Sequence, residues 1–166
     1  KQDVKIHNGD TALHLAVAGG HNDLIKMVMT DARAKAVNDG GASPWMDAIR
    51  ENKIEVAKVL IPLSNVNDRM KNGKTPLHIA AEKSDVDGVK WVYGLRKKTL
   101  EYHDNKGNTP LLSALVGKKP LNAVKLLELG AKGDCKNKAG ETPFSLATAK
   151  GYADVLQVLA TKGITQ

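Results

Sequence analysis

Short apolar runs recur along this chain in pairs, and each pair follows a polar segment that contains a glycine. The first run approximates Thr-Pro-Leu-x-x-Ala, and the second lies fifteen to twenty residues after the glycine. Apolar positions in the second runs are spaced i, i+1, i+4 and i+5, which marks one face of a helix. The pattern predicts pairs of short helices and therefore an all-α protein.

The paired unit is repeated five times in register. Its copies read GDTALHLAVAGGH from Gly9, GASPWMDAIRENK from Gly41, GKTPLHIAAEKSD from Gly73, GNTPLLSALVGKK from Gly107 and GETPFSLATAKGY from Gly140. The glycines are separated by 32, 32, 34 and 33 residues. A fixed period of this length is typical of a solenoid, in which each repeat packs on its neighbours.

These residues resemble the ankyrin repeat, which has a period of about 33 residues and a Thr-Pro-Leu-His-x-Ala signature. The resemblance runs from about Lys5 to Gly163. It implies an all-α ankyrin-repeat solenoid of helix–turn–helix units joined by β-hairpin-like loops. On this basis residues 1–166 form a single ankyrin-repeat domain, with repeats one to five at about 5–36, 37–68, 69–102, 103–135 and 136–166.

The residues around each first helix favour the same structure. A hydroxyl side chain stands at each expected N-cap, where it can accept a hydrogen bond from a free backbone N–H. Proline follows in four copies, at a position where its missing N–H costs nothing. Gly20, Asn52 and Gly151 suit the left-handed conformation that ends a helix. The expected N-caps are Thr11, Ser43, Thr75, Thr109 and Thr142.

The tripeptide Gly73-Lys74-Thr75 also matches the end of a phosphate-binding loop. Such a loop needs a glycine five residues earlier, where this chain has Asp68, and a preceding buried strand. Thr75 is therefore interpreted as a helix cap, and no nucleotide or other cofactor is expected.

The remaining candidate chemistry is weak. His14 and His78 occupy the histidine of the signature, which in the ankyrin family hydrogen-bonds to the neighbouring loop. No histidine pair has metal-ligand spacing, and Cys135 is the only cysteine, so no metal site is expected. We expect Cys135 to be an inert core thiol. No serine lies in a nucleophile-elbow context, so the chain is not expected to be an enzyme.

Two residues of repeat two depart from the pattern. Trp45 replaces the signature leucine and is expected to fill the core. Asp47 occupies a register that holds Leu15, Ile79, Ser113 and Leu146 in the other copies. A polar side chain bonded locally and a partner-contacting residue are both open interpretations of Asp47.

Composition gives expectations for the partner, the location and the association state of the protein. The chain of 166 residues carries a net charge of +7, which suggests an acidic partner. A single cysteine favours an intracellular location, cytoplasmic or nuclear. No apolar run approaches the roughly 20 residues of a membrane span. We expect a monomer or part of a longer chain. Apolar residues crowd both end helices, whereas the ends of a solenoid are normally polar, and this favours part of a longer chain.

The resemblance also implies a contact surface, because ankyrin partners lie against the loop tips and the concave face of the first helices. In the matching registers, repeats one and two carry Arg50 against Asp10, Asp39 and Glu51, whereas repeats three to five carry six lysines against Glu82 and Glu141. Just before a loop tip, Arg69 extends the basic stretch. The candidate contact residues are Asp39, Arg50, Glu51, Arg69, Lys71, Lys74, Glu82, Lys83, Lys106, Lys138 and Lys150.

The sequence therefore predicts a protein–protein interaction module that binds an acidic segment of its partner. A solvated lysine-rich face is the alternative interpretation of the charges. Nucleic acid is disfavoured as the acidic partner, since the surface lacks aromatic stacking residues. A second function remains open, in which the chain recruits substrates for a larger enzyme or effector whose catalytic domain lies outside it.

Overall fold

The computed structural model describes residues 4–165 and contains, within that range, eleven α-helices, two short 3-10 helices and no strand. No helix in this range is long and apolar enough to cross a membrane. The α-helices are α1 (Ala12–Gly19), α2 (Asn22–Val28), α3 (Asp31–Lys35), α4 (Pro44–Arg50), α5 (Ile54–Leu60), α6 (Pro76–Lys83), α7 (Val86–Leu95), α8 (Pro110–Val116), α9 (Pro120–Glu128), α10 (Pro143–Lys150) and α11 (Ala153–Thr161), and the 3-10 helices are η1 (Ile61–Leu63) and η2 (Lys97–Glu101).

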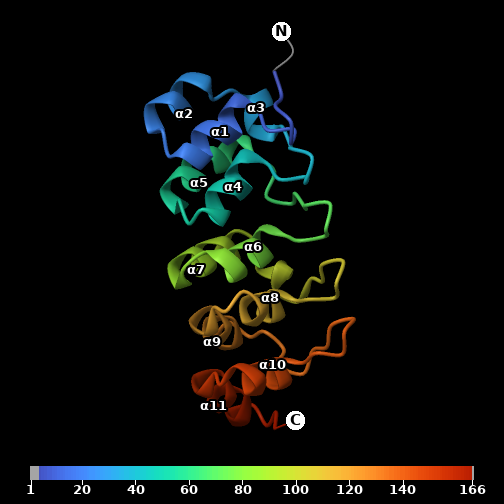
Figure 1. Cartoon of the computed structure of the whole chain (residues 1–166). Coiled ribbons are helices and arrows are strands. Elements are labelled where there is room, and N and C mark those ends of the chain that lie inside the picture. Colours follow the sequence, from blue (N-terminus) through green and yellow to red (C-terminus); the bar gives the residue numbers. More distant parts are fainter. Residues whose placement is uncertain (1–3, 166) are drawn as a thin grey trace.

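The helices are stacked in two rows, as Figure 1 shows. An inner row contains α1, α4, α6, α8 and α10, and an outer row contains α2, α5, α7, α9 and α11, while the loops project on the side away from the outer row. This arrangement confirms the predicted all-α ankyrin-repeat solenoid. One element was not expected: α3 follows α2 in repeat one, and its N-cap Thr30 accepts a 3.3 Å hydrogen bond from the Arg33 N–H.

The predicted caps are confirmed at three of the five inner helices. Thr75, Thr109 and Thr142 each accept a hydrogen bond from the N–H three residues later, at 3.4, 3.4 and 3.1 Å. At Thr11 the hydroxyl oxygen lies 2.9 Å from His14 Nδ1. The expectation for Ser43 was wrong, because its side chain accepts no bond from α4 although its backbone is in the N-cap conformation.

Left-handed residues follow three of the inner helices as expected, with φ of 71° at Gly20, 53° at Asn52 and 69° at Gly151. The core between the rows combines alanines with leucines and other large apolar side chains. Trp45 is 1% exposed, which confirms its place in the core. The alanine shared by all inner helices is at most 1% exposed in each, at Ala16, Ala48, Ala80, Ala114 and Ala147.

Each loop is a tight turn closed by a hydrogen bond from a backbone N–H to the carbonyl four residues later, as from Met70 to Lys74 at 3.0 Å. Neighbouring loops are joined by one further backbone bond. These bonds, which we term the loop ladder, run from Asp39 N–H to Asn8 O, Lys71 N–H to Gly40 O, Asn105 N–H to Asn72 O and Lys138 N–H to Lys106 O, at 2.8 to 3.0 Å. The loop ladder therefore holds the loop turns in a single row along the stack.

Glycine is required where the loops approach one another. Gly73 has a φ of +80°, and a Cβ built there would lie 2.9 Å from the Asn105 nitrogen, which is part of the loop ladder. Both the left-handed backbone and the close contact exclude a larger side chain at this position.

Side chains of the next repeat cap the C-terminal ends of the inner helices. The Lys53 ammonium donates to the carbonyls of Val17 and Ala18 at 2.9 and 2.6 Å. Ser84 Oγ donates to the Ile49 carbonyl at 2.8 Å. Asn122 Nδ2 donates to Ala81 and Ser84 carbonyls, both at 3.0 Å. These bonds satisfy carbonyls that a helix leaves unpaired at its end, and they tie repeats one to four to one another.

The two ends of the stack differ. Repeat one exposes Leu15, Leu24 and Met27, the last at 81%. In α11, by contrast, Leu159 is fully buried, and Ile164 packs against the core after the helix ends.

Candidate interaction surface

The predicted contact residues lie on two elements of each repeat. The loop tips carry Asp39, Lys71, Lys106 and Lys138, all exposed, and their backbones form the loop ladder. The C-terminal ends of the inner helices carry Arg50, Lys83 and Lys150, which are also exposed. Because backbone bonds fix the loops relative to one another, the charged side chains start from fixed positions along the stack.

Ion pairs divide the six candidate lysines into two groups. Glu82 pairs with Lys74, and its other oxygen lies 3.1 Å from the Lys83 ammonium. Burial acts to raise the pKa of Glu82, but Lys74 and Lys83 together lower it below the usual range, so the carboxylate stays ionised. Within residues 4–165, Lys71, Lys106, Lys138 and Lys150 form no such pair.

Arg69 contributes in a different way from the lysines. Its guanidinium lies 4.8 Å from the centre of the Tyr102 ring, and the Arg96 guanidinium lies 5.9 Å from the same ring. The ring therefore holds the exposed Arg69 side chain at the base of loop four.

Arg50, in repeat two, is engaged by its own helix. It lies 2.8 Å from Asp47 and 3.6 Å from Glu51. Asp47 is 2% exposed, and burial raises its pKa although the Arg50 charge opposes this. The structure thus shows the local pairing for Asp47, within α4.

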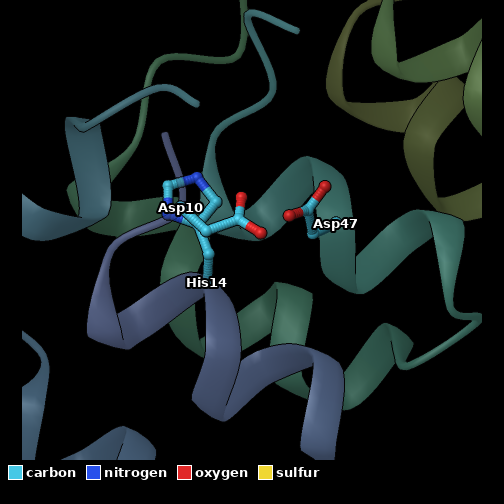
Figure 2. A group of neighbouring side chains, drawn as sticks. All are labelled: Asp10, His14 and Asp47. Carbon is cyan, nitrogen blue, oxygen red and sulfur yellow. The ribbon is translucent and has the colours of Figure 1, made fainter. Parts of the chain in front are cut away.

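Asp10, His14 and Asp47 form a group with potential ligand atoms within 4.8 Å of one another, drawn in Figure 2. His14 Nε2 lies 3.0 Å from the Ala42 carbonyl, which can only accept, so this nitrogen carries the proton. His14 Nδ1 then accepts from the Thr11 N–H at 3.2 Å. The Asp10 oxygens accept from Asn38 and Asn8 at 2.9 and 2.7 Å. Since these atoms are engaged within the protein, we assign the group a structural role.

His78 repeats this arrangement in repeat three. Its Nε2 donates to the Asn108 carbonyl at 2.9 Å, and its Nδ1 accepts from the Thr75 N–H at 3.2 Å. Burial is the main cause that lowers the pKa of His78 to about 4. The predicted role of both signature histidines, linking one repeat to the next loop, is confirmed.

Cys135 is half-buried and packs against the core, with Thr109 Oγ1 3.4 Å from its sulfur. Burial raises the pKa of the thiol, so it is protonated at neutral pH and a poor nucleophile.

The inner side of the loops is hollowed between repeats three and five. One hollow of about 520 Å³ lies between loops four and five and is lined by Asn105, Lys106, Asn108, Val116, Asn137, Lys138, Ala139 and Glu141. A second, of about 290 Å³, lies between loops three and four. They share Asn105, Lys106, Asn108 and Val116, so they form one trough, here named the loop-side groove.

One lining residue was not singled out from the sequence. Ser113 lies in the second hollow, is 2% exposed, and its hydroxyl has no hydrogen-bond partner among the described residues. Its register holds apolar residues in three other copies, and this departure is the signal that marks it.

Comparison with known proteins agrees with the geometry. The family described as ankyrin repeats in three copies matches three overlapping stretches, residues 1–70, 34–102 and 63–135. The human transient receptor potential cation channel subfamily A member 1 is 28% identical over 155 residues, which are 91% of this chain and 14% of that protein.

Two further relatives are the Caenorhabditis elegans ankyrin repeat and KH domain-containing protein mask-1 and the chicken nuclear factor NF-kappa-B p105 subunit. The first is 29% identical over 93% of this chain, and the second 25% over 94%. The chain spans only 14%, 6% and 13% of these three relatives. With the matched stretches, the five glycine turns and the loop ladder, these likenesses show that the chain belongs to the ankyrin repeat family.

Proposed function

We propose that this chain binds a protein partner by holding an acidic segment of it against the loop tips and inner helices of repeats three to five. Ankyrin repeats are generally protein–protein interaction modules. The observation that supports the acidic partner is the row of Lys71, Lys106 and Lys138. These side chains are exposed, unpaired with any described acid, and carried on loops that backbone bonds hold in line.

A fixed row of like charge has a definite effect on binding. It attracts an oppositely charged segment before contact, so it raises the association rate and selects among partners more than it adds affinity. Because the loops are already ordered by the loop ladder, binding does not have to order them, and that entropic cost is avoided.

Nucleic acid fits this surface less well. No aromatic side chain lines either hollow of the loop-side groove, and Glu82 and Glu141 would repel a phosphate backbone. Catalysis in this chain is not part of the proposal, because the groove is an open trough and the histidine nitrogens nearest to it are hydrogen-bonded within the fold. An intracellular setting, favoured by the single cysteine, belongs to the proposal.

A second function is favoured by one observation, that the chain spans a small part of its relatives. Within a longer protein, the same surface would recruit the substrate or target of an enzyme or effector. The contact residues would be unchanged, so both functions predict the same effect of substitutions at Lys71, Lys106 and Lys138.

The experiment begins by capturing partners with the folded chain and identifying them. The triple variant Lys71→Glu, Lys106→Glu and Lys138→Glu should then lower the association rate by roughly tenfold or more, since steering effects of this kind span about 10- to 1,000-fold. The wild-type rate should fall as salt rises, and the variant should lose that dependence. Association is measured by stopped flow at several salt concentrations.

A matched control reverses three exposed lysines remote from the loops, namely Lys26, Lys90 and Lys162. It changes the net charge equally and should leave the rate close to the wild-type value. Equal rates for wild type and the loop variant, on protein shown to be folded by its melting temperature, would mean that the lysine row is only a solvated face.

A further inference from the structure

The loop-side groove carries three unused features side by side: two unpaired ammonium groups, an exposed apolar side chain and a buried hydroxyl without a partner. They lie on loops four and five and on α8, around the two joined hollows. Together they indicate the chemistry of the segment that would fill it.

The polar walls of the groove are already satisfied by one another. Asn137 Nδ2 donates to Asn108 Oδ1 at 2.9 Å and to Glu141 Oε2 at 2.8 Å. Asp104 Oδ1 accepts from the N–H groups of Lys106 and Asn108 at 2.8 and 2.9 Å. The amides and carboxylates are therefore held as a scaffold, which leaves the ammonium groups of Lys106 and Lys138 as the available charges.

The floor of the groove is apolar at one point. Val116 lines both hollows and is 47% exposed. The corresponding residues of the other inner helices are Ala18, Arg50, Glu82 and Ala149, so only repeat four places a large apolar side chain in this register. An exposed valine in a hollow flanked by lysines suits an apolar side chain that arrives next to an acidic one.

Ser113 lies one turn before Val116 on α8, and side chains three apart on a helix are neighbours. Its hydroxyl is buried in the wall of the second hollow with no partner among residues 4–165. Buried hydroxyls in native structures almost always have a partner, and a polar group of an incoming segment would supply one here.

Building on the proposed function, we propose that the loop-side groove binds an extended peptide segment in which acidic residues flank one apolar residue. The acidic side chains pair with Lys106 and Lys138, the apolar side chain covers Val116, and a polar group of the segment bonds to Ser113. A free anion would leave Val116 uncovered, and a purely apolar segment would leave both lysines unpaired.

The close approach of α8 to α6 shapes the groove at its end. A Cβ built at Gly117 would lie 2.8 Å from the Glu82 carbonyl oxygen and 3.0 Å from its Cα. Glycine therefore lets the end of α8, with Val116, lie directly against the Glu82–Lys74 pair of repeat three, which forms the far wall.

The test uses the capped peptide Gly-Glu-Leu-Glu-Gly and two matched peptides, one with Gln in place of Glu and one with Ser in place of Leu. Isotope-labelled protein is titrated and followed by NMR. The Glu-Leu peptide should cause saturable shifts at Lys106, Ser113, Val116 and Lys138. Each matched peptide should bind at least several-fold more weakly.

Protein variants separate the contacts. Val116→Ser should weaken the Leu peptide and leave the Ser peptide unchanged, whereas Val59→Ser, at a 52% exposed valine on α5, should change neither. Lys106→Gln with Lys138→Gln should remove the preference for Glu over Gln.

Two results would overturn the inference. One is the absence of saturable shifts at these residues up to millimolar peptide. The other is equal binding of the Leu and Ser peptides together with no effect of Val116→Ser, which would leave a charge row and no apolar subsite. Neither result touches the proposed function, whose failure appears separately as an unchanged rate for the lysine triple variant with the captured partner.

Discussion

At the scale of single residues, side chains of the same type either bond within the fold or stay available for a partner. Their surroundings in the folded stack decide which. Thr75 and His78 form hydrogen bonds within the fold. Their positions and roles could be predicted from the sequence, because both follow from a local signature. The ion pair of Lys74 with Glu82 could not be predicted from the sequence, because it depends on how loop three folds over α6. Lys106, on the next loop, stays available because no described acidic side chain pairs with it.

Replacing Thr75 with Ala should lower the free energy of unfolding by about 1 kcal/mol, since an N-cap hydroxyl is lost. Ser43→Ala is the matched control, because Ser43 occupies the same register but does not cap α4. The Ser43 hydroxyl is buried and accepts no bond from α4, so its removal should lower the free energy of unfolding less than that of Thr75. Urea denaturation of both variants measures the difference. Equal losses would show that the register itself, and not the hydroxyl bond, sets the cost.

The free energy of unfolding should decrease as the pH is lowered, and His78 is the group responsible. Its folded-state pKa of about 4 lies below the ordinary 6.5, so the unfolded chain takes up the proton first as pH falls. The contribution is complete above pH 6.5 and is lost between 6.5 and about 4. From pH 7.5 to pH 5 the loss should be about 2 kcal/mol. His78→Gln, which can still donate to Asn108, should lack this part of the pH dependence, and identical slopes for the two proteins would contradict it.

At the scale of elements, periodicity and caps predicted where helices begin, and Gly20, Asn52 and Gly151 predicted where three inner helices end. The short helix α3 was missed, because residues 31–35 carry no signature and are ordered by Thr30 and by packing of Ala34. The caps that Lys53, Ser84 and Asn122 provide were also missed. Each bonds to carbonyls more than thirty residues away, and a linear sequence does not show that distance.

Lys53→Ala should therefore destabilise the junction of α1 with repeat two by about 1–3 kcal/mol, because the Val17 and Ala18 carbonyls lose a charged donor. Lys58→Ala is the control, because Lys58 lies on α5, the helix that begins just after Lys53. Its ion pair with Glu55 is exposed and worth at most about 1 kcal/mol. Hydrogen exchange of the amides in α1 should quicken only in the Lys53 variant. A loss no larger than that of the control would make the Lys53 bonds incidental.

At the scale of the whole molecule, stability is a sum over repeats and the interfaces between them, so an end repeat is held from one side only. Repeat one is such an end in this chain, and it also exposes Leu24 and Met27 on α2. Repeats three and four, which carry much of the loop-side groove, have neighbours on both sides, whereas repeat five, which lines its other end, is the last repeat that the structure describes (Figure 1). Most of the residues that line the groove thus lie on repeats that are held from both sides.

Amides of α1 and α2 should consequently exchange faster than those of α6 and α8, and substitutions in α2 should separate by burial. Ile25 is 3% exposed, so Ile25→Ala should cost about 2–5 kcal/mol. Met27 on the same helix is 81% exposed, so Met27→Ala should change the free energy of unfolding by less than about 0.5 kcal/mol. Denaturation across a range of protein concentrations distinguishes the possible outcomes. If Met27→Ala costs as much as Ile25→Ala, and the cost grows with protein concentration, the exposed face of α2 is covered by a second copy in solution, and the expectation of a monomer is wrong.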